Sequence, residues 1–314
     1  MKKIIPFVSG SDRQITHLWL KYLQDEMSEY NIVLFDDLSK EQKLNAKFAI
    51  IANPNPSNIL QMKNLKWVQS LWAGVEKLLD SIPNPSFQIV RMVDPVLSNT
   101  MAESVLAWTL YLHKNMHLYH SQQRQKIWKP HIETLSKDKN ILILGLGKLG
   151  LASAFKLKKN GFNVLGWSKS KKQIDEVITY HGDEGLETAL KLAHIVVCLL
   201  PLTKQTNNLL NKQKLDLLNS NASIINFARA GIIDYDYLVE KLNKSELSHA
   251  ILDVFYEEPL NCDSLLWENE NITILPHISG PTDMASASKI VSKNLKQYYE
   301  KGIIPISIDI KKGY

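Results

Sequence analysis

The strongest constraint on the fold lies in the middle of the chain, where a glycine motif joins an apolar run to a helical pattern. Residues 140–144 read Asn-Ile-Leu-Ile-Leu, which suits a buried parallel strand. In a strand–turn–helix unit, three glycines spaced as G-x-G-x-x-G allow a tight turn, close approach of a pyrophosphate and close helix–strand packing. The free N–H groups at the helix N-terminus then favour a phosphate, although a glycine-rich turn without a ligand is an alternative. The motif predicts a dinucleotide site formed by Gly145, Leu146, Gly147, Lys148, Leu149 and Gly150.

Short apolar runs alternate with amphipathic segments on both sides of this motif, which predicts α/β folding with parallel sheets. Expected strands cover residues 3–8, 31–35, 48–52, 67–71, 88–93, 141–144, 164–167, 195–199, 223–226, 250–254, 272–275 and 303–310. Because the dinucleotide motif stands mid-chain, we predict two Rossmann- or flavodoxin-like domains. A cofactor domain, 101–281, is inserted into a substrate domain made of 1–100 and 282–314.

Helical patterns occupy the segments between the expected strands. The longest begins near Asn99 and runs to about Arg124, and Thr100 followed by Glu103 fits a capping box at its start. Other helices are expected at 16–29, 151–160 and 285–301, whereas 126–140 is polar and irregular.

Composition excludes several classes of protein. The 37 basic and 32 acidic residues give a net charge of +5, and the basic residues are scattered, so we expect no nucleic-acid partner. No apolar run reaches transmembrane length, and Pro6 interrupts the short N-terminal one, so neither a membrane partner nor a signal peptide is expected. Cys198 lies in an apolar run and Cys262 stands apart, which fits a reducing compartment. We therefore expect a cytoplasmic protein.

The end of the strand at 164–167 bears on the choice of nucleotide. Sites for NAD place an acidic residue there to bind the ribose 2′-hydroxyl. Here residues 166–172 read Gly-Trp-Ser-Lys-Ser-Lys-Lys, without an acid. The hydroxyl and ammonium groups of Ser168, Lys169 and Ser170 suit a 2′-phosphate, so we predict NADP(H) as the preferred cofactor. NAD(H) stays open, because a lysine-rich turn can also be merely solvated and Lys grips phosphate less specifically than Arg.

Three later segments each follow an expected strand, which is where folds of this kind carry their chemistry. Reduction of a 2-oxo acid needs a planar donor for the carboxylate and carbonyl, which suits Arg229. It needs a proton donor that works near neutral pH, which suits His277. A carboxylate on the other ring nitrogen would orient this imidazole and favour its protonated form, which suits Glu258. Singly, each residue could be a solvated or structural group, but together behind a dinucleotide motif they favour catalysis.

The order and content of these segments resemble the D-specific 2-hydroxyacid dehydrogenase family over nearly the whole chain. After G-x-G-x-x-G, that family has an N-x-x-R-G, a D-V-F-x-x-E-P-L and a P-H-I segment, matched here from Asn226, Asp253 and Pro276. The family uses Arg, Glu and His in the roles assigned above. The resemblance therefore implies a hydride transfer between a nicotinamide cofactor and a small 2-oxo or 2-hydroxy acid.

The same resemblance implies further site residues and a partner. Residues 70–76 resemble the family's A-G-V-D loop, whose backbone N–H groups receive the substrate carboxylate, and residues 200–206 resemble the loop that covers the cofactor. The side chain of Asp253 and the carbonyl of Ala228 would face the nicotinamide amide, beside Arg229 and His277. In the family, the long helix after residue 99 builds a homodimer, so a homodimer is expected. The implied loop residues are Trp72, Ala73, Gly74 and Val75 for substrate, and Leu200, Pro201, Leu202 and Thr206 for cofactor.

Within the family, the turn at 167–170 and the Trp-Lys-Pro at 128–130 resemble the branch of glyoxylate and hydroxypyruvate reductases, which prefers NADPH. Three positions depart from the pattern: Ala230 replaces a Gly, Glu76 replaces an Asp, and Lys169 replaces an Arg. Glyoxylate or hydroxypyruvate is therefore the expected substrate, and the product is a D-2-hydroxy acid.

Other functions stay open at this point. The protein could act on another 2-hydroxy acid, such as one like lactate, or it could be a cofactor-sensing binding protein on the same fold. His113, His117 and His120 recur at helical spacing, but no acidic or thiol ligand accompanies them. A solvated or dimer-facing helix is the favoured interpretation of this face, and no metal is expected.

Overall fold

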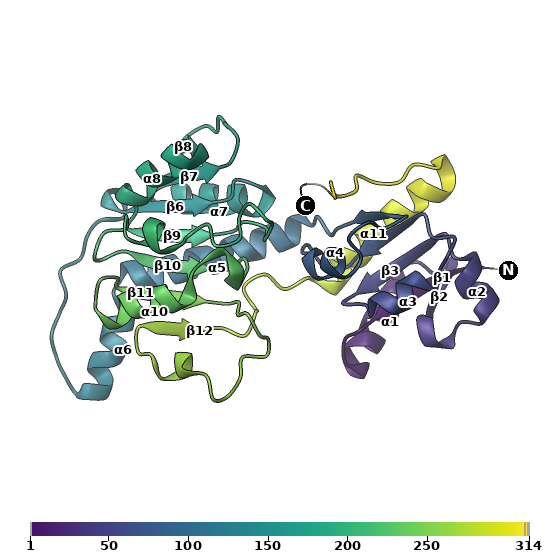
Figure 1. Cartoon of the computed structure of the whole chain (residues 1–314), viewed down its shortest axis with the longest axis horizontal. Helices are drawn as coiled ribbons and strands as arrows, with labels where there is room; N and C mark the ends of the chain where they lie inside the picture. Colours follow the sequence, from purple (N-terminus) through teal and green to yellow (C-terminus); the bar gives the residue numbers. More distant parts are fainter. Residues whose placement is uncertain (1, 311, 313–314) are drawn as a thin grey trace. The chain divides into compact units, whose positions relative to one another are not determined.

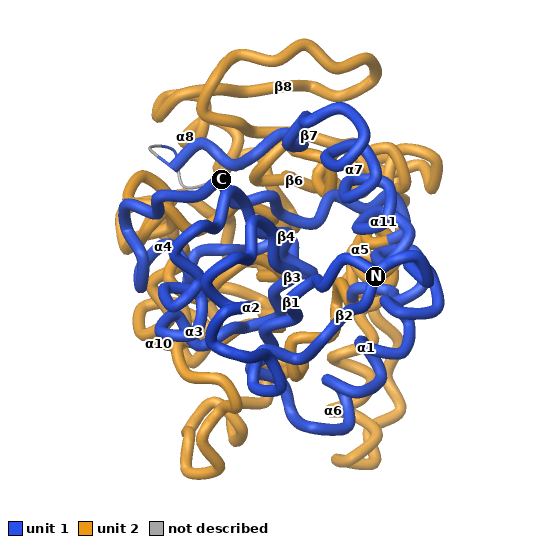
Figure 2. Tube along the Cα trace, turned by 90° about the vertical axis from the view of Figure 1, so that its right-hand side faces the viewer, with its two compact units in different colours: residues 1–96, 282–314 blue, residues 97–281 orange. Residues whose placement is uncertain are grey.

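The computed structural model describes residues 2–310 and 312, and the chain forms two compact units (Figure 2). Unit 1 consists of Met1–Val96 with Thr282–Tyr314, and unit 2 of Leu97–Pro281. Each unit is built on its own sheet. Residues 97–100, predicted for the first domain, belong to unit 2 because the helix that contains them continues into it.

Among its described residues, unit 1 forms a five-stranded parallel sheet in the order β2-β1-β3-β4-β5, a flavodoxin-like arrangement. Its strands are β1 Lys3–Ser9, β2 Tyr30–Leu34, β3 Phe48–Ala52, β4 Trp67–Ser70 and β5 Gln88–Val90. Its helices are α1 Arg13–Glu26, α2 Lys40–Asn45, α3 Pro56–Leu60, α4 Glu76–Ser81 and α11 Met284–Lys301.

Successive residues of β3 pack on opposite faces of this sheet, as the pleat requires. Phe48 and Ile50 join a core with α1 and α11, whereas Ala49 and Ile51 join a second core with α3 and α4. Both faces are covered, which explains why the strands read as continuous apolar runs rather than alternating ones.

Local signals fix the ends of the two longer helices of unit 1. The Asp12 carboxylate accepts the backbone N–H groups of residues 14 and 15 at the start of α1. Asp283 accepts the N–H of Ser286 at the start of α11, and Gly302, with φ 68°, ends that helix.

Unit 2 forms, over the residues described, a seven-stranded parallel sheet in the order β12-β11-β10-β9-β6-β7-β8, which extends a Rossmann order by one strand (Figure 1). Its strands are β6 Asn140–Leu144, β7 Asn163–Ser168, β8 Ile178–His181, β9 Ile195–Cys198, β10 Ser223–Asn226, β11 His249–Leu252 and β12 Ile272–Ile274. Its helices are α5 Pro95–His113, α6 Met116–Gln125, α7 Lys148–Lys159, α8 Gly182–Leu192, α9 Lys212–Leu215 and α10 Tyr235–Asn243.

The central strand β6 again separates two cores. Leu142 and Leu144 pack with α8 and α10, whereas Ile141 and Ile143 pack with α5 and α7. Two parallel sheets with helices on both faces confirm the predicted fold class. None of the helices in the described residues is both long enough and apolar enough to cross a membrane.

The prediction for the long helix was wrong in two respects. The helix begins at Pro95, where the Asp94 carboxylate accepts the N–H of Val96, so Thr100 lies inside it and forms no capping box. It also ends at His113, because Asn115 takes the left-handed conformation with φ 56°, and α6 then starts afresh.

Two strand predictions were also wrong. Residues 303–310 form no strand in the described chain: the N–H of Ile308 donates to the carbonyl of Ile89, but Pro305 has no N–H to contribute to a ladder. Strand β8 was missed because its side chains are mostly exposed or half-buried at the sheet edge, so no apolar run marks it.

Candidate active site

Three turns that follow neighbouring strands carry the predicted catalytic residues. Arg229 follows β10, Glu258 follows β11 and His277 follows β12, and these strands lie side by side in unit 2 (Figure 1). Because carboxyl ends of parallel strands meet at one edge of a sheet, the three turns share that edge.

The imidazole and the carboxylate form a direct pair. His277 Nδ1 lies 2.8 Å from Glu258 Oε2, and the other oxygen, Oε1, accepts the backbone N–H of Phe255 at 2.9 Å. The carboxylate is therefore fixed on its own turn, and it orients the ring so that Nε2 remains for a ligand. The His277 side chain is 49% exposed, so a ligand can reach it. His277 also has a φ of 55°, a left-handed conformation of the kind found where structure is constrained for function.

Asp253 fixes the turn that follows His277. Its side chain is buried, and its two oxygens accept the backbone N–H groups of Ile278 at 2.7 Å and Ser279 at 3.0 Å. A buried carboxylate with two such bonds is a rigid anchor. The contact of Asp253 with a nicotinamide amide stays a prediction.

The turn that carries Arg229 is held from beneath by a buried amide. Asn226 Nδ2 donates to the carbonyl of Arg229 at 3.1 Å, and Asn226 Oδ1 accepts the N–H of Ala228 at 3.1 Å. The guanidinium itself donates to the Ala228 carbonyl at 2.6 Å. The methyl group of Ala230, which departs from the family's Gly, is buried in the core beneath this turn.

The glycine turn has the shape that a dinucleotide requires. Gly145 has a φ of 103°, and a Cβ on Gly150 would lie 1.8 Å from the Gly145 carbonyl oxygen, so neither position accepts a side chain. Among the described atoms, none lies within 4 Å of where a Cβ of Gly147 would be, so this backbone is open to a ligand. No side chain caps the start of α7, whose first N–H groups suit a pyrophosphate.

The turn after β7 holds the groups predicted for the adenosine end of the cofactor. The Ser168 hydroxyl donates to the carbonyl of Ser170 at 2.8 Å, and the Lys169 ammonium contacts the amide oxygen of Gln205. Lys172 donates to the Leu146 carbonyl in the glycine turn at 2.7 Å. Two ammonium groups of this turn are therefore held by neighbouring loops, and the contact of the turn with a 2′-phosphate stays a prediction.

The loop predicted to cover the cofactor is stabilised by Thr206. Its hydroxyl donates to the carbonyl of Pro201 at 2.6 Å and accepts the N–H of Thr203 at 2.8 Å. Leu200 is buried and Leu202 packs against the core of unit 2. The loop is therefore well ordered, and its contact with a cofactor stays a prediction.

The predicted substrate loop, Trp72 to Val75, belongs to unit 1, whereas the three catalytic candidates belong to unit 2. It follows β4, where Ser70 Oγ accepts the N–H of Trp72 at 3.0 Å and donates to its carbonyl. The Trp72 ring packs edge-on against Trp19 with centroids 5.8 Å apart, and Val75 leads into α4.

The helix carrying His113, His117 and His120 was predicted to be solvated or dimer-facing, and the solvated interpretation is wrong for the first two. The dimer-facing alternative stays a prediction. His113 is buried against Phe162, and His117 is buried against His249, while His120 is exposed. Within the described residues, no group of three or more His, Cys, Asp or Glu side chains is arranged to hold a metal ion.

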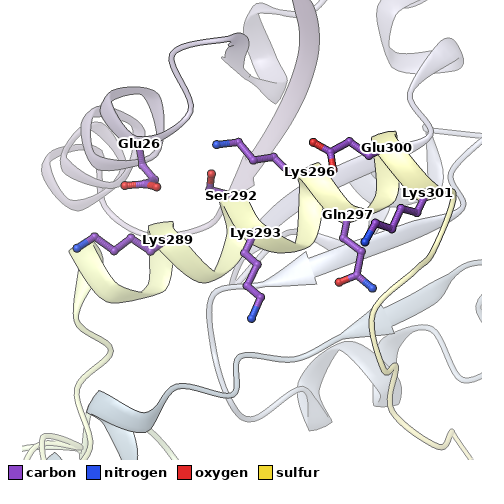
Figure 3. Close-up of a pocket in the computed structure, with 8 residues that line it drawn as sticks. All are labelled: Glu26, Lys289, Ser292, Lys293, Lys296, Gln297, Glu300 and Lys301. Atoms are coloured by element: carbon purple, nitrogen blue, oxygen red, sulfur yellow. The ribbon is translucent and has the colours of Figure 1, made fainter.

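A separate hollow lies on unit 1 between α1 and α11 (Figure 3). Its lining includes Lys289, Lys293 and Lys296, and Figure 3 shows their ammonium groups pointing in different directions rather than toward one point. These ammonium groups do not converge on one point, so the candidate site remains the sheet edge of unit 2.

Several supporting residues were missed from the sequence. Asn226 stands in a recognised motif but was given no role, and Tyr235 and Gln205 were not identified as partners of the site turns. Asn226 could have been found from the general rule that a buried polar residue at a strand end bonds to the adjoining turn. The contacts of Tyr235 and Gln205 are tertiary and leave no local signal.

Known proteins resemble this chain throughout. Residues 106–279 match the model for the NAD-binding domain of D-isomer specific 2-hydroxyacid dehydrogenases. A glyoxylate/hydroxypyruvate reductase A from Yersinia enterocolitica is 36% identical over 306 residues, covering 94% of this chain and 96% of that protein. A D-isomer specific 2-hydroxyacid dehydrogenase from Xanthobacter autotrophicus, solved with NADPH and MES, superposes with a TM-score of 0.92 at 29% identity, covering 100% of both chains. An NADPH-dependent glyoxylate/hydroxypyruvate reductase from Sinorhizobium meliloti, solved with NADP and sulfate, gives a TM-score of 0.89 at 25% identity, also covering 100% of both.

The chain therefore belongs to the D-isomer specific 2-hydroxyacid dehydrogenase family. This confirms the resemblance and the enzyme class predicted from the sequence: the protein is an NAD(P)-dependent oxidoreductase of 2-hydroxy acids.

Proposed function

We propose that this enzyme reduces glyoxylate and hydroxypyruvate to the corresponding 2-hydroxy acids with NADPH, hydroxypyruvate giving the D-isomer. The observation that carries the proposal is the His277–Glu258 pair at 2.8 Å, on a sheet edge shared with Arg229. The substrate assignment is supported by the relatives named above, two of which are glyoxylate/hydroxypyruvate reductases.

The chemistry divides among three side chains. Arg229 holds the carboxylate and polarises the carbonyl oxygen through its planar donors. A reduced nicotinamide cofactor, when bound, would supply the hydride that the carbonyl carbon takes up. His277 gives its Nε2 proton to the carbonyl oxygen, which becomes the hydroxyl of the product, and the neutral ring then takes a proton from solvent. Glu258 keeps the Nδ1–H directed at itself, so Nε2 faces the substrate. By resemblance, the backbone N–H groups of the Trp72 loop receive the substrate carboxylate.

Support for NADPH over NADH comes from the turn after β7. No carboxylate stands at residues 166–172, and Lys169 and Lys172 have their ammonium groups at Gln205 and Leu146, within that turn's surroundings. Solved relatives contain NADPH or NADP. A 2′-phosphate would be stabilised by these cations, whereas a bare ribose would lack the usual acidic partner.

We also propose that the enzyme is a cytoplasmic homodimer. Residues 127–135, here called the arm, run without regular secondary structure between α6 and β6 (Figure 1). Trp128 and Ile132 on the arm are wholly exposed and Leu135 is largely exposed. Such exposed apolar side chains suit burial against a second copy of the chain. The cytoplasmic placement is supported by the free thiols of Cys198 and Cys262.

The first test is the oxidation of NADPH, followed by absorbance, with glyoxylate and then hydroxypyruvate, and with NADH in parallel. We expect rapid turnover with NADPH and at least 10-fold lower kcat/KM with NADH, since a phosphate–lysine pair contributes on the order of 1–2 kcal/mol. Faster turnover with NADH would reject the cofactor preference. No turnover of any 2-oxo acid, despite cofactor binding, would instead favour a cofactor-sensing protein.

A further inference from the structure

Two catalytic turns of unit 2 are joined by a buried tyrosine that takes no part in the reaction. Tyr235 is the first residue of α10, is 5% exposed, and lies beneath the ends of β10 and β11. Its hydroxyl donates to the carbonyl of Val254 at 2.9 Å and accepts Asn226 Nδ2 at 3.0 Å. Val254 lies on the chain that leads to Glu258, and Asn226 holds the turn of Arg229. One hydroxyl therefore links both turns.

Each end of this link leads by short, direct contacts to a side chain of the site. On one side, the Asn226 side-chain N–H donates to the Arg229 carbonyl, and the Asn226 side-chain oxygen accepts the backbone N–H of Ala228. On the other side, Val254 adjoins Phe255, whose N–H donates to Glu258, and Glu258 holds His277. A displacement at the hydroxyl would thus change the spacing between the guanidinium and the imidazole.

A second tyrosine joins the same two turns nearer the surface. The Tyr256 hydroxyl donates to the carbonyl of Ile233, which ends the Arg229 turn, at 3.1 Å. The rings of Tyr256 and Tyr235 pack edge-on with centroids 5.7 Å apart. Hydrogen bonds from two tyrosine hydroxyls and one aromatic contact therefore connect the two turns.

We propose that Tyr235 is a positioning residue, which ties the Arg229 turn to the Glu258 turn and so fixes the distance between the group that holds the substrate and the group that protonates it. This inference rests on the proposed roles of Arg229 and His277. Burial raises the pKa of Tyr235 and so favours the protonated hydroxyl, which donates to Val254. Substrate geometry in such sites matters at the scale of about 1 Å, where misplacement can cost roughly 100-fold in rate.

The test uses Tyr235→Phe in the full-length enzyme, with Tyr237→Phe as the matched control. Tyr237 lies on the same helix and its hydroxyl also makes a hydrogen bond, but to Asp216, away from the catalytic turns. We expect Tyr235→Phe to lower kcat/KM by about 10- to 100-fold. The NADPH affinity of Tyr235→Phe should stay within about twofold of that of the unsubstituted enzyme, because the glycine turn is not part of this network. For Tyr237→Phe, both kcat/KM and NADPH affinity should stay within about twofold.

A double-mutant cycle with Arg229→Lys separates positioning from general support of the fold. The readouts are kcat/KM and the affinity of the enzyme–NADPH complex for oxalate, a mimic of a 2-oxo acid that cannot be reduced. If Tyr235 acts through Arg229, the fold-loss in kcat/KM and in oxalate affinity caused by Tyr235→Phe should be at least fivefold smaller in the Arg229→Lys background than in the unsubstituted enzyme. If the fold-loss of the double variant equals the product of the two single fold-losses, the inference is overturned. It is also overturned if Tyr235→Phe has the same kinetics as the Tyr237→Phe control.

Two further outcomes are decisive. If Tyr235→Phe does not fold, Tyr256→Phe replaces it in the cycle, with a smaller expected loss of about 3- to 10-fold because that ring is exposed. If the unsubstituted protein reduces no 2-oxo acid, the proposed function fails, but the oxalate cycle still tests the link between the turns. Absence of oxalate binding by the unsubstituted protein would remove the role of Arg229 and overturn this inference with it.

Discussion

Unit 2 contains two very different histidine environments. His277 stands on an open turn, half exposed, with a carboxylate 2.8 Å from its Nδ1. His117 and His249 lie inside the unit, 9% and 3% exposed, with ring centroids 4.7 Å apart. Their Nε2 atoms face the hydroxyls of Ser248 and Thr273 instead of carboxylates.

The two environments differ in how far they bury the ring and in the groups beside it. The His277 ring is half exposed and lies beside the Glu258 carboxylate. Burial lowers the pKa of His117 to about 4 and that of His249 to about 3, with further lowering from His131 and His117 respectively. In the mechanism proposed above, His277 transfers a proton, whereas burial favours the neutral rings of His117 and His249.

The largest expected effect comes from removing the exposed imidazole. In His277→Ala, we expect kcat for glyoxylate to fall on the order of 10³-fold, because the variant lacks the proposed proton donor. NADPH binding, followed by fluorescence, and the thermal midpoint should change little. Unchanged turnover would contradict the assigned role and remove the contrast between the two histidine sites.

A smaller effect is expected from neutralising the partner of His277. Glu258→Gln keeps a hydrogen-bonding group of the same shape but removes the negative charge, so we expect kcat to fall by about 10- to 100-fold. Steady-state kinetics with NADPH measures this fall. A variant with the activity of the unsubstituted enzyme would show that a neutral hydrogen-bonding group is sufficient beside His277, as the hydroxyls are beside the buried pair.

The buried framework of both units could be predicted from the sequence because fully covered parallel strands are continuous apolar runs. Strands β3 and β10 were predicted with their observed ends, and β6 and β9 to within one residue. The two ends of the long helix were predicted wrongly, because the signals that mark them are weaker than an apolar run. Asp94 followed by Pro95 is a stronger helix start than Thr100, and the left-handed Asn115 breaks a pattern whose polarity looked continuous.

The site could be predicted only as far as its motifs reach. Arg229, Glu258 and His277 stand in segments whose order along the chain signals their role. The environment of His117 could not be predicted, because it depends on His249. This residue lies 132 positions further along the sequence and contacts His117 only in the folded unit. The link through Tyr235 was missed for the same reason.

The smallest expected effect is on stability rather than on catalysis, and it tests the environment of the buried pair, His117 and His249. His249→Gln replaces the ring by a group of similar size that cannot take up a proton and can still bond to Thr273. In the unsubstituted protein, both pKa values lie below the unfolded value of 6.5, so the unfolded chain binds protons that the folded chain rejects. Stability is therefore full above about pH 6.5 and falls as the pH drops toward 4, by about 2 kcal/mol for each ring at pH 5.

The measurement is the free energy of unfolding in urea at pH 7.5 and pH 5, with the exposed His120→Gln as the matched control. We expect His249→Gln to lose about 2 kcal/mol less than the unsubstituted protein between these pH values, while His120→Gln keeps the full loss. Turnover at pH 7.5 should be unaffected by either change, since neither ring touches the catalytic turns. An equal pH dependence in all three proteins would mean that the buried rings accept protons as readily as exposed ones. The two histidine environments would then differ in position but not in chemistry.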